Sequence, residues 1–133
     1  MIGVLLITHG RLGAHFVETV TGMIGDLSRP TEVLEVHRHD DPDERSQAAA
    51  DALARLDDGD GVLIITDAFG STPSNIATRA AAPDRTRVVA GINLSMLVRV
   101  YNYPQLALDD LAASAIEAGR AGVMPCPQPD PSP

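Results

Sequence analysis

Short apolar runs and longer helical segments alternate along this chain, and the alternation limits the folds that it can adopt. A short apolar run rich in branched side chains at residues 2–8 is typical of a buried strand, and we expect three further strands at residues 31–36, 61–66 and 87–90. Helical spacing or helix-start residues mark the segments 12–24, 42–56, 72–82, 94–101 and 104–119. Alternating strands and helices form parallel sheets with right-handed crossovers. We therefore expect an α/β fold: a doubly wound, mainly parallel sheet of four strands with helices on both faces, and room for an extra antiparallel edge strand.

Two of the helices have recognisable starts. Asp41 precedes Pro42, so we expect Asp41 to be the N-cap and Pro42 to lie in the first turn. Thr72 precedes Pro73 in the same way, and we expect Thr72 to cap the helix that follows. The first backbone amides of a helix have no acceptor within it, and such an end binds anions.

Length and composition exclude several classes of protein. The 133 residues suffice for one domain, which we place at 1–124, followed by a proline-rich tail at 125–133 that we expect to be disordered. The net charge of −8 argues against nucleic acid and anionic membranes as partners. The one cysteine, Cys126, permits no internal disulfide, and no apolar run reaches the roughly 18 residues of a membrane span. We therefore expect a cytoplasmic protein that does not span a membrane.

Two potential catalytic side chains follow the first and third predicted strands. His9 comes after the first strand and Asp67 after the third, and these strands are usually neighbours in a doubly wound sheet. A neutral imidazole is a nucleophile at one ring nitrogen while the other keeps its proton. A carboxylate that accepts this proton's hydrogen bond fixes the tautomer and stabilises the cation formed on attack. A histidine at a strand end is most often a turn or core residue, so the pair needs further support.

The loop after Asp67 adds an anion-binding segment. Gly70 lets the backbone come close to a ligand, and the hydroxyls of Ser71 and Thr72 can donate to phosphate oxygens at the start of a helix. Each of these residues also has a purely structural interpretation as part of a turn or a helix start. Their position on one edge with His9 and Asp67 predicts phosphoryl transfer through a phosphohistidine.

Four stretches carry a resemblance to a known family: 7–10, 66–75, 88–97 and 117–123. In order and spacing they resemble the IIA domain of the mannose class of the bacterial sugar phosphotransferase system. The resemblance implies that His9 accepts a phosphoryl group from the phosphocarrier HPr and passes it to a IIB partner, which phosphorylates a sugar during uptake. It also implies that Asp67 orients the imidazole and that Thr72 and nearby amides hold the phosphoryl group. The implied assembly is a homodimer that exchanges its last short strand, without a metal or an organic cofactor.

Three features depart from the family pattern. Prolines occupy the tail where the exchanged strand would lie, and because proline cannot donate to a sheet ladder they argue against strand exchange, though not against a dimer. His37 and His39, two apart on the end of the second strand, would point the same way and could bind a metal. Since only these two ligands stand together, a solvated strand end without metal is the favoured interpretation. Because no IIB-like stretch follows the IIA-like region within these 133 residues, we expect a standalone IIA component.

Several functions remain open on this sequence. A phosphocarrier would pass its phosphoryl group to a separate IIB-type acceptor. A regulator would use the phosphorylated and bare forms of His9 to bind different protein partners, without transport. A binding module of the same fold would hold a small molecule and take up no phosphoryl group. Related phosphohistidine subunits also serve dihydroxyacetone kinases, but the loop at 69–73 looks more like the mannose class.

Overall fold

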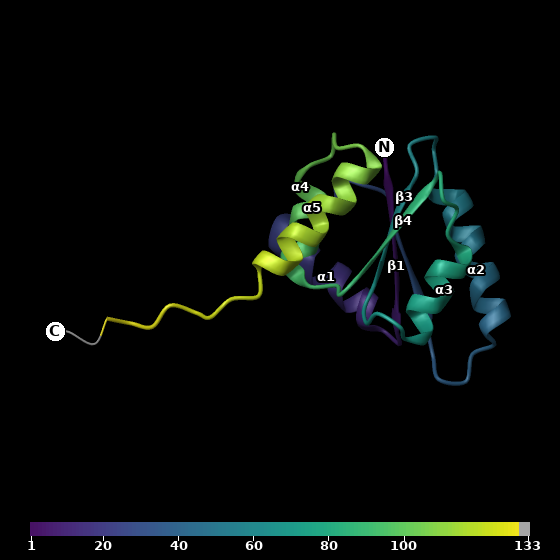
Figure 1. Ribbon diagram of the computed structural model, residues 1–133, viewed down its shortest axis with the longest axis horizontal. Helices are drawn as coiled ribbons and strands as arrows, with labels where there is room; N and C mark the ends of the chain where they lie inside the picture. The colour runs from purple at the N-terminus through teal and green to yellow at the C-terminus, as the bar shows by residue number, and fades with distance from the viewer. Residues whose placement is uncertain (131–133) are drawn as a thin grey trace.

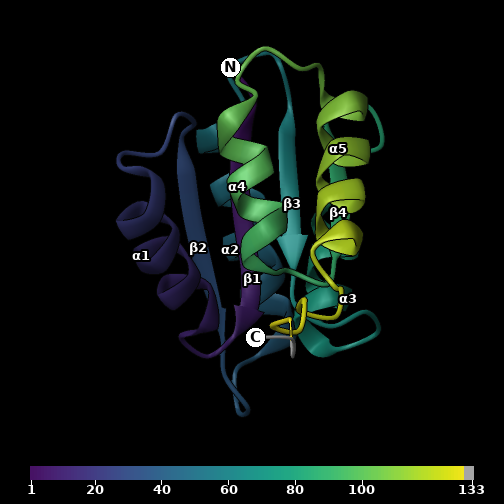
Figure 2. The same ribbon diagram turned by 90° about the vertical axis from the view of Figure 1, so that its left-hand side faces the viewer.

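The computed structural model describes residues 1–130 and has one parallel sheet at its centre. Its strands lie in the order β2-β1-β3-β4 (Figure 2), and every neighbouring pair is parallel. The strands are β1 (Gly3–His9), β2 (Thr31–Val36), β3 (Val62–Thr66) and β4 (Thr86–Ala90). The expected doubly wound α/β fold is thus confirmed, and residues 1–130 contain no additional antiparallel edge strand.

Helices cover both faces of the sheet in three layers (Figure 1). One face carries α1 (Leu12–Ile24), α4 (Leu94–Asn102) and α5 (Leu108–Ala121), and the other carries α2 (Pro42–Leu56) and α3 (Thr72–Ala80). Alternate side chains of each central strand enter the two cores. In β1, Val4 and Leu6 pack towards the first layer, and Leu5 and Ile7 towards the second. Burial on both faces explains why the central strands β1 and β3 are largely continuous apolar runs.

Proline and acidic residues mark two of the helix starts, and the structure confirms the first prediction but not the second. The expected N-cap is confirmed for α2, where the Asp41 carboxylate accepts the Asp43 amide at 3.0 Å. The predicted helix at 104–119 is wrong at its start, because α5 begins at Leu108. Pro104 disfavours a helical conformation in Tyr103, the residue before it, and α5 instead begins where Asp109 and Asp110 complement the positive end of the helix dipole.

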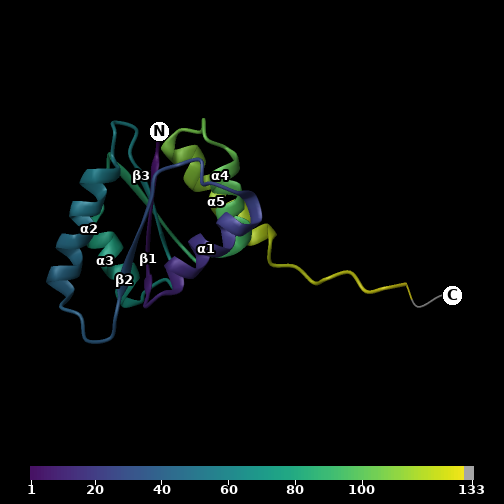
Figure 3. The same cartoon turned by 180° about the vertical axis from the view of Figure 1, so that it is seen from behind.

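Beyond α5 the chain leaves the body of the protein. Residues 123–130 are exposed, have no helix or strand, and run away from the sheet (Figures 1 and 3). The last three residues of the predicted tail, 131–133, lie outside the described part of the chain. The boundary at 124 and the disorder of the tail stay predictions. No helix within residues 1–130 is both long and apolar enough to cross a membrane.

A buried arginine ties the end of α4 to the sheet. Arg29 is only 3% exposed, and its guanidinium donates to the carbonyls of Val100 at 3.1 Å, Ile2 at 3.3 Å and Tyr103. Two of these carbonyls lie at the C-terminal end of α4, where helix carbonyls lack intrahelical donors and carry partial negative charge. Burial lowers the pKa of Arg29, because the charged guanidinium loses its hydration on leaving water. The hydrogen bonds to the three carbonyls replace part of this hydration.

We expect Arg29→Ala to lower the free energy of unfolding by about 3 kcal/mol, because it removes the donor from two buried carbonyls and one part-buried carbonyl. Arg29→Lys should recover little, since an ammonium cannot reach the same spread of acceptors. Urea denaturation measures both. The control is Arg55→Ala, which removes an exposed ion pair with Glu32 and should cost at most about 1 kcal/mol. A loss for Arg29→Ala no larger than that of the control would contradict this role.

A carboxylate closes the turn between α2 and β3. Asp57 accepts from the Arg85 guanidinium at 2.6 and 2.9 Å, and from the amides of Gly59 at 2.9 Å and Gly61 at 3.1 Å. The Arg85 guanidinium and these two amides hold the pKa of Asp57 well below its ordinary value. The ionised side chain therefore stabilises the folded protein.

The stabilisation by Asp57 should depend on pH. Because the pKa of Asp57 is lower in the folded chain than the value of about 3.9 in an unfolded one, its contribution is complete above about pH 5 and is lost as the pH falls towards the folded pKa. Asp57→Asn should reduce stability at pH 7 and flatten its decline below about pH 4. Urea denaturation across this pH range tests the prediction, and identical pH slopes for both proteins would refute it.

Candidate functional site

Parallel pairing of β1 with β3 brings His9 and Asp67 together at the carboxyl edge of the sheet. Oδ2 of Asp67 accepts the backbone amide of His9 at 2.8 Å and lies 2.7 Å from Nδ1 of the His9 ring. The other carboxylate oxygen accepts the amide of Ala68 at 2.8 Å. The His9 side chain is 58% exposed, whereas that of Asp67 is 10% exposed. Asp67 therefore holds both the backbone and the ring of His9 from a shielded position, and leaves Nε2 accessible.

The protonation of the pair follows from these contacts. Burial opposes ionisation of Asp67, but the backbone amide of His9, its ring and the amide of Ala68 outweigh it and lower the pKa of Asp67 below its ordinary value. Asp67 is thus a carboxylate at neutral pH. A carboxylate at Nδ1 favours the ring tautomer with its proton on Nδ1, so that Nε2 carries the free electron pair.

Residues on either side of His9 fix its position. Thr8 is fully buried, and its hydroxyl accepts the amide of Gly13 at 2.7 Å, which joins the end of β1 to the first turn of α1. Gly10 has φ +46°, a conformation that favours glycine, and its amide donates to the Val36 carbonyl at 2.8 Å. The chain therefore turns directly after His9. Thr8 was not predicted as a site residue; its only sequence signal is a hydroxyl five residues before a helix glycine.

The loop from Asp67 to α3 differs from the prediction in one respect. Ser71 is the N-cap of α3 and Thr72 is its first residue, so the prediction that Thr72 caps the helix is wrong. The tight turn accounts for this: Gly70 has φ +82°, and both the amide and the hydroxyl of Ser71 donate to the Ala68 carbonyl, at 3.2 and 2.6 Å. Because the Ser71 side chain is engaged there, no side chain caps the first amides of α3.

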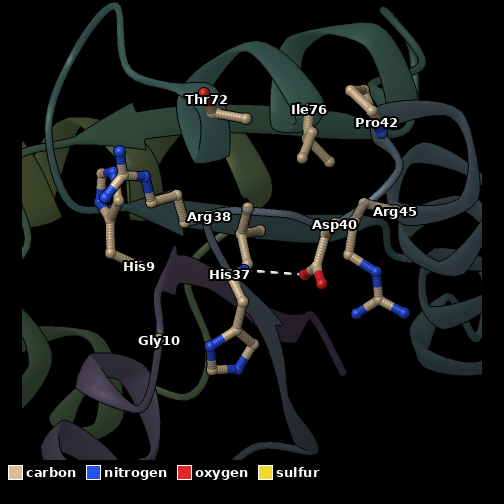
Figure 4. Close-up of a pocket in the computed structure, with 10 residues that line it drawn as sticks. His9, Gly10, His37, Arg38, Asp40, Pro42, Arg45, Thr72 and Ile76 are labelled. Carbon is tan, nitrogen blue, oxygen red and sulfur yellow. Dashed lines mark hydrogen bonds between the residues drawn. The ribbon is translucent and has the colours of Figure 1, made fainter.

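A cavity of about 560 Å³ opens beside His9 (Figure 4). Thr72 and Ile76 of α3 line one side, and Arg38 of the loop between β2 and α2 lines another. The structure thus brings together three predicted site residues, His9, Asp67 and Thr72. Gly70 and Ser71 lie in the adjoining turn and do not line the cavity.

The histidines after β2 are placed differently from the expectation. β2 ends at Val36, so His37 and His39 lie in the following turn, and the argument from strand alternation does not apply to them. Nε2 of His37 lies 2.9 Å from the Glu35 carboxylate. Within residues 1–130 no group of three or more His, Cys, Asp or Glu side chains is placed to hold a metal ion.

Together these residues form a site suited to anionic groups. It combines an imidazole whose Nε2 is free, a carboxylate that can balance a positive ring, and an uncapped helix start on the wall of one cavity. Such an arrangement supports nucleophilic attack by a histidine on an electrophile that carries negative charge.

Comparisons with known proteins place the chain in a family. The model of the family EIIA-man, described as "PTS system fructose IIA component", matches residues 3–116. The chain is 30% identical over 129 residues to the PTS system mannose-specific EIIAB component of Escherichia coli (strain K12), an alignment that covers 92% of this chain. It spans 38% of the length of that protein.

Solved structures agree in fold. The mannose/sorbose specific IIA subunit of the phosphotransferase system from Enterococcus faecalis superposes with a TM-score of 0.87 at 26% identity, over 98% of each chain. The phosphotransferase system component EIIA from Streptococcus agalactiae superposes with a TM-score of 0.76 at 24% identity, over 94% of this chain and 97% of that one, and shows the fold alone.

Proposed function

The chain belongs to the EIIA-man family, the mannose-class IIA components of the sugar phosphotransferase system, and we propose on this basis that it is a phosphocarrier. It accepts a phosphoryl group on His9 from phospho-HPr and passes it to a IIB-type acceptor in sugar uptake. The observation that supports this proposal most directly is the contact of 2.7 Å between Nδ1 of His9 and Asp67, which leaves Nε2 free beside a cavity with an anion-binding helix start.

The chemistry is a single displacement at phosphorus. Nε2 of His9 attacks the phosphorus of the donor phosphohistidine, and the new N–P bond forms as the donor's N–P bond breaks. The electron pair of the broken bond stays on the donor imidazole. Nδ1 of His9 keeps its proton and donates a hydrogen bond to Asp67, whose carboxylate balances the positive charge of the phosphorylated ring. The same step, with His9 as donor, loads the acceptor.

Three residues after Asp67 serve the transferred group in different ways. Thr72 lines the cavity, so its hydroxyl and the first amides of α3 donate to the phosphoryl oxygens. Gly70 and Ser71 shape the turn that aims this helix start at His9. No metal or organic cofactor takes part, because positioning and electrostatic stabilisation carry phosphoryl transfer between histidines.

The partners and compartment follow from the carrier role. An HPr-type donor and a IIB-type acceptor both work in the cytoplasm, and we assign the protein to it. We also assign a homodimer, as the family resemblance implies.

The proposal is tested by mixing the purified protein with enzyme I, HPr and phosphoenolpyruvate and measuring its intact mass before and after acid. We expect one added phosphoryl group that acid removes. If HPr becomes charged and the protein gains no mass, the carrier role is refuted and small-molecule binding becomes the better hypothesis. Adding candidate IIB proteins to the charged protein then distinguishes a carrier, which loses its phosphoryl group to one of them, from a regulator.

A further inference from the structure

One arginine of the cavity wall has no ion-pair partner. All 10 basic residues apart from histidine are arginines, and five of them form ion pairs with carboxylates: Arg45, Arg55, Arg79, Arg85 and Arg87. Arg38 forms none with the residues that the structure describes, although the chain carries a net charge of −8. A free guanidinium in so acidic a protein is available to an external anion.

The loop between β2 and α2 holds Arg38 in place over the cavity. The His37 amide donates to the Asp40 carboxylate at 2.8 Å, and the Asp40 amide donates to the His37 carbonyl at 3.1 Å. These two bonds close a tight turn, and they direct the carboxylate of Asp40 to the backbone, away from Arg38 (Figure 4). Arg45, the other arginine of the cavity, is engaged by Glu44 and by the Glu35 carbonyl, so Arg38 is the cation left for a ligand.

Arg38 and His9 face the same cavity. Both line it, and Figure 4 draws the guanidinium of Arg38 beside the ring of His9, with Thr72 on the helix start across from them. A phosphoryl group on Nε2 would bring negative charge next to the carboxylate of Asp67. Donors at Thr72 cover one side of this group, and a planar guanidinium, which binds two oxygens at once, suits the other side.

We propose that Arg38 binds the phosphoryl group during transfer and is a further catalytic residue of the site. The inference rests on the proposed phosphocarrier function. The guanidinium donates to the equatorial oxygens while the N–P bond to Nε2 forms, and its charge offsets that of Asp67 and of the transferred group. Such donors contribute about 10²- to 10³-fold in rate, and because Arg38 is exposed its effect should lie at or below the lower end of this range, at about 10- to 100-fold.

The test is the rate of phosphoryl uptake from phospho-HPr, followed by rapid quenching over a range of HPr concentrations. Arg38→Ala should lower the rate at saturating HPr by about 10- to 100-fold with little change in KM, and Arg38→Lys should recover part of it. Free guanidinium added to Arg38→Ala should restore some rate, which a purely structural residue would not allow. The control Arg55→Ala removes one equal charge near the far end of α2 and should leave the rate unchanged.

The outcomes separate the inference from the function on which it rests. If the natural protein takes up no phosphoryl group from charged HPr, both are overturned. If it is phosphorylated and Arg38→Ala keeps the saturating rate of the control, the inference alone is overturned. A rise in KM at an unchanged saturating rate also overturns it, because Arg38 would then only dock HPr. Thermal denaturation checks that each variant is folded. The rate of Arg38→Lys is a second, independent test, because it should lie between the rates of Arg38→Ala and the natural protein.

Discussion

Replacing His9 with alanine is expected to abolish phosphoryl uptake from phospho-HPr, with no acid-labile mass gain after complete charging of HPr. The variant loses the one imidazole whose Nε2 is free while its Nδ1 is held by a carboxylate. Because the His9 side chain is 58% exposed and is not part of either hydrophobic core, its removal should change the free energy of unfolding by less than about 1 kcal/mol. Intact mass with acid treatment and urea denaturation measure the two effects separately.

His37 provides a matched control for this experiment. It lines the same cavity, is 55% exposed, and also lies beside a carboxylate. The difference is the nitrogen engaged: Glu35 lies 2.9 Å from Nε2 of His37, whereas Asp67 holds Nδ1 of His9. His37→Ala should therefore keep phosphoryl uptake. If His9→Ala still gains an acid-labile phosphoryl group and His37→Ala does not, the nucleophile has been assigned to the wrong histidine.

The sequence predicts the framework well where local signals and burial agree. β2 and α2 have the expected bounds, because branched residues mark the strand and Asp41 with Pro42 marks the helix start. The meeting of His9 with Asp67 was also predictable, since it needs only the strand order and the rule that parallel strands end at one edge.

The parts that escaped prediction depend on how loops run through space. The N-cap position falls on Ser71 instead of Thr72 because the turn at Gly70 closes one residue earlier than the Thr-Pro pair indicates. Arg38 gives no signal in the sequence, where it stands in a polar stretch that reads as a solvated strand end. Its place over the cavity follows only from the turn that Asp40 closes. Such contacts between distant segments have no local pattern.

Asp67→Asn is expected to keep the fold but slow phosphoryl transfer by about 10²- to 10⁴-fold. The amide is nearly the same size, and its oxygen can still accept the backbone amide of His9. It carries no charge to balance the phosphorylated ring. In the opposite amide orientation the NH2 group takes the place of Oδ2 and donates to Nδ1, which favours the proton on Nε2 and removes the electron pair that attacks phosphorus.

Rapid-quench measurement of a single turnover from phospho-HPr reports this rate directly. Asp43→Asn is the control for charge, because Asp43 is an exposed acid whose loss removes only a surface ion pair with Arg79. Asp67→Glu keeps the charge but moves the carboxylate by one methylene, so it should transfer faster than Asp67→Asn and more slowly than the natural protein. Equal rates in Asp67→Asn and Asp43→Asn would mean that neither the tautomer nor the charge of the ring depends on Asp67. The 2.7 Å contact would then be structural alone.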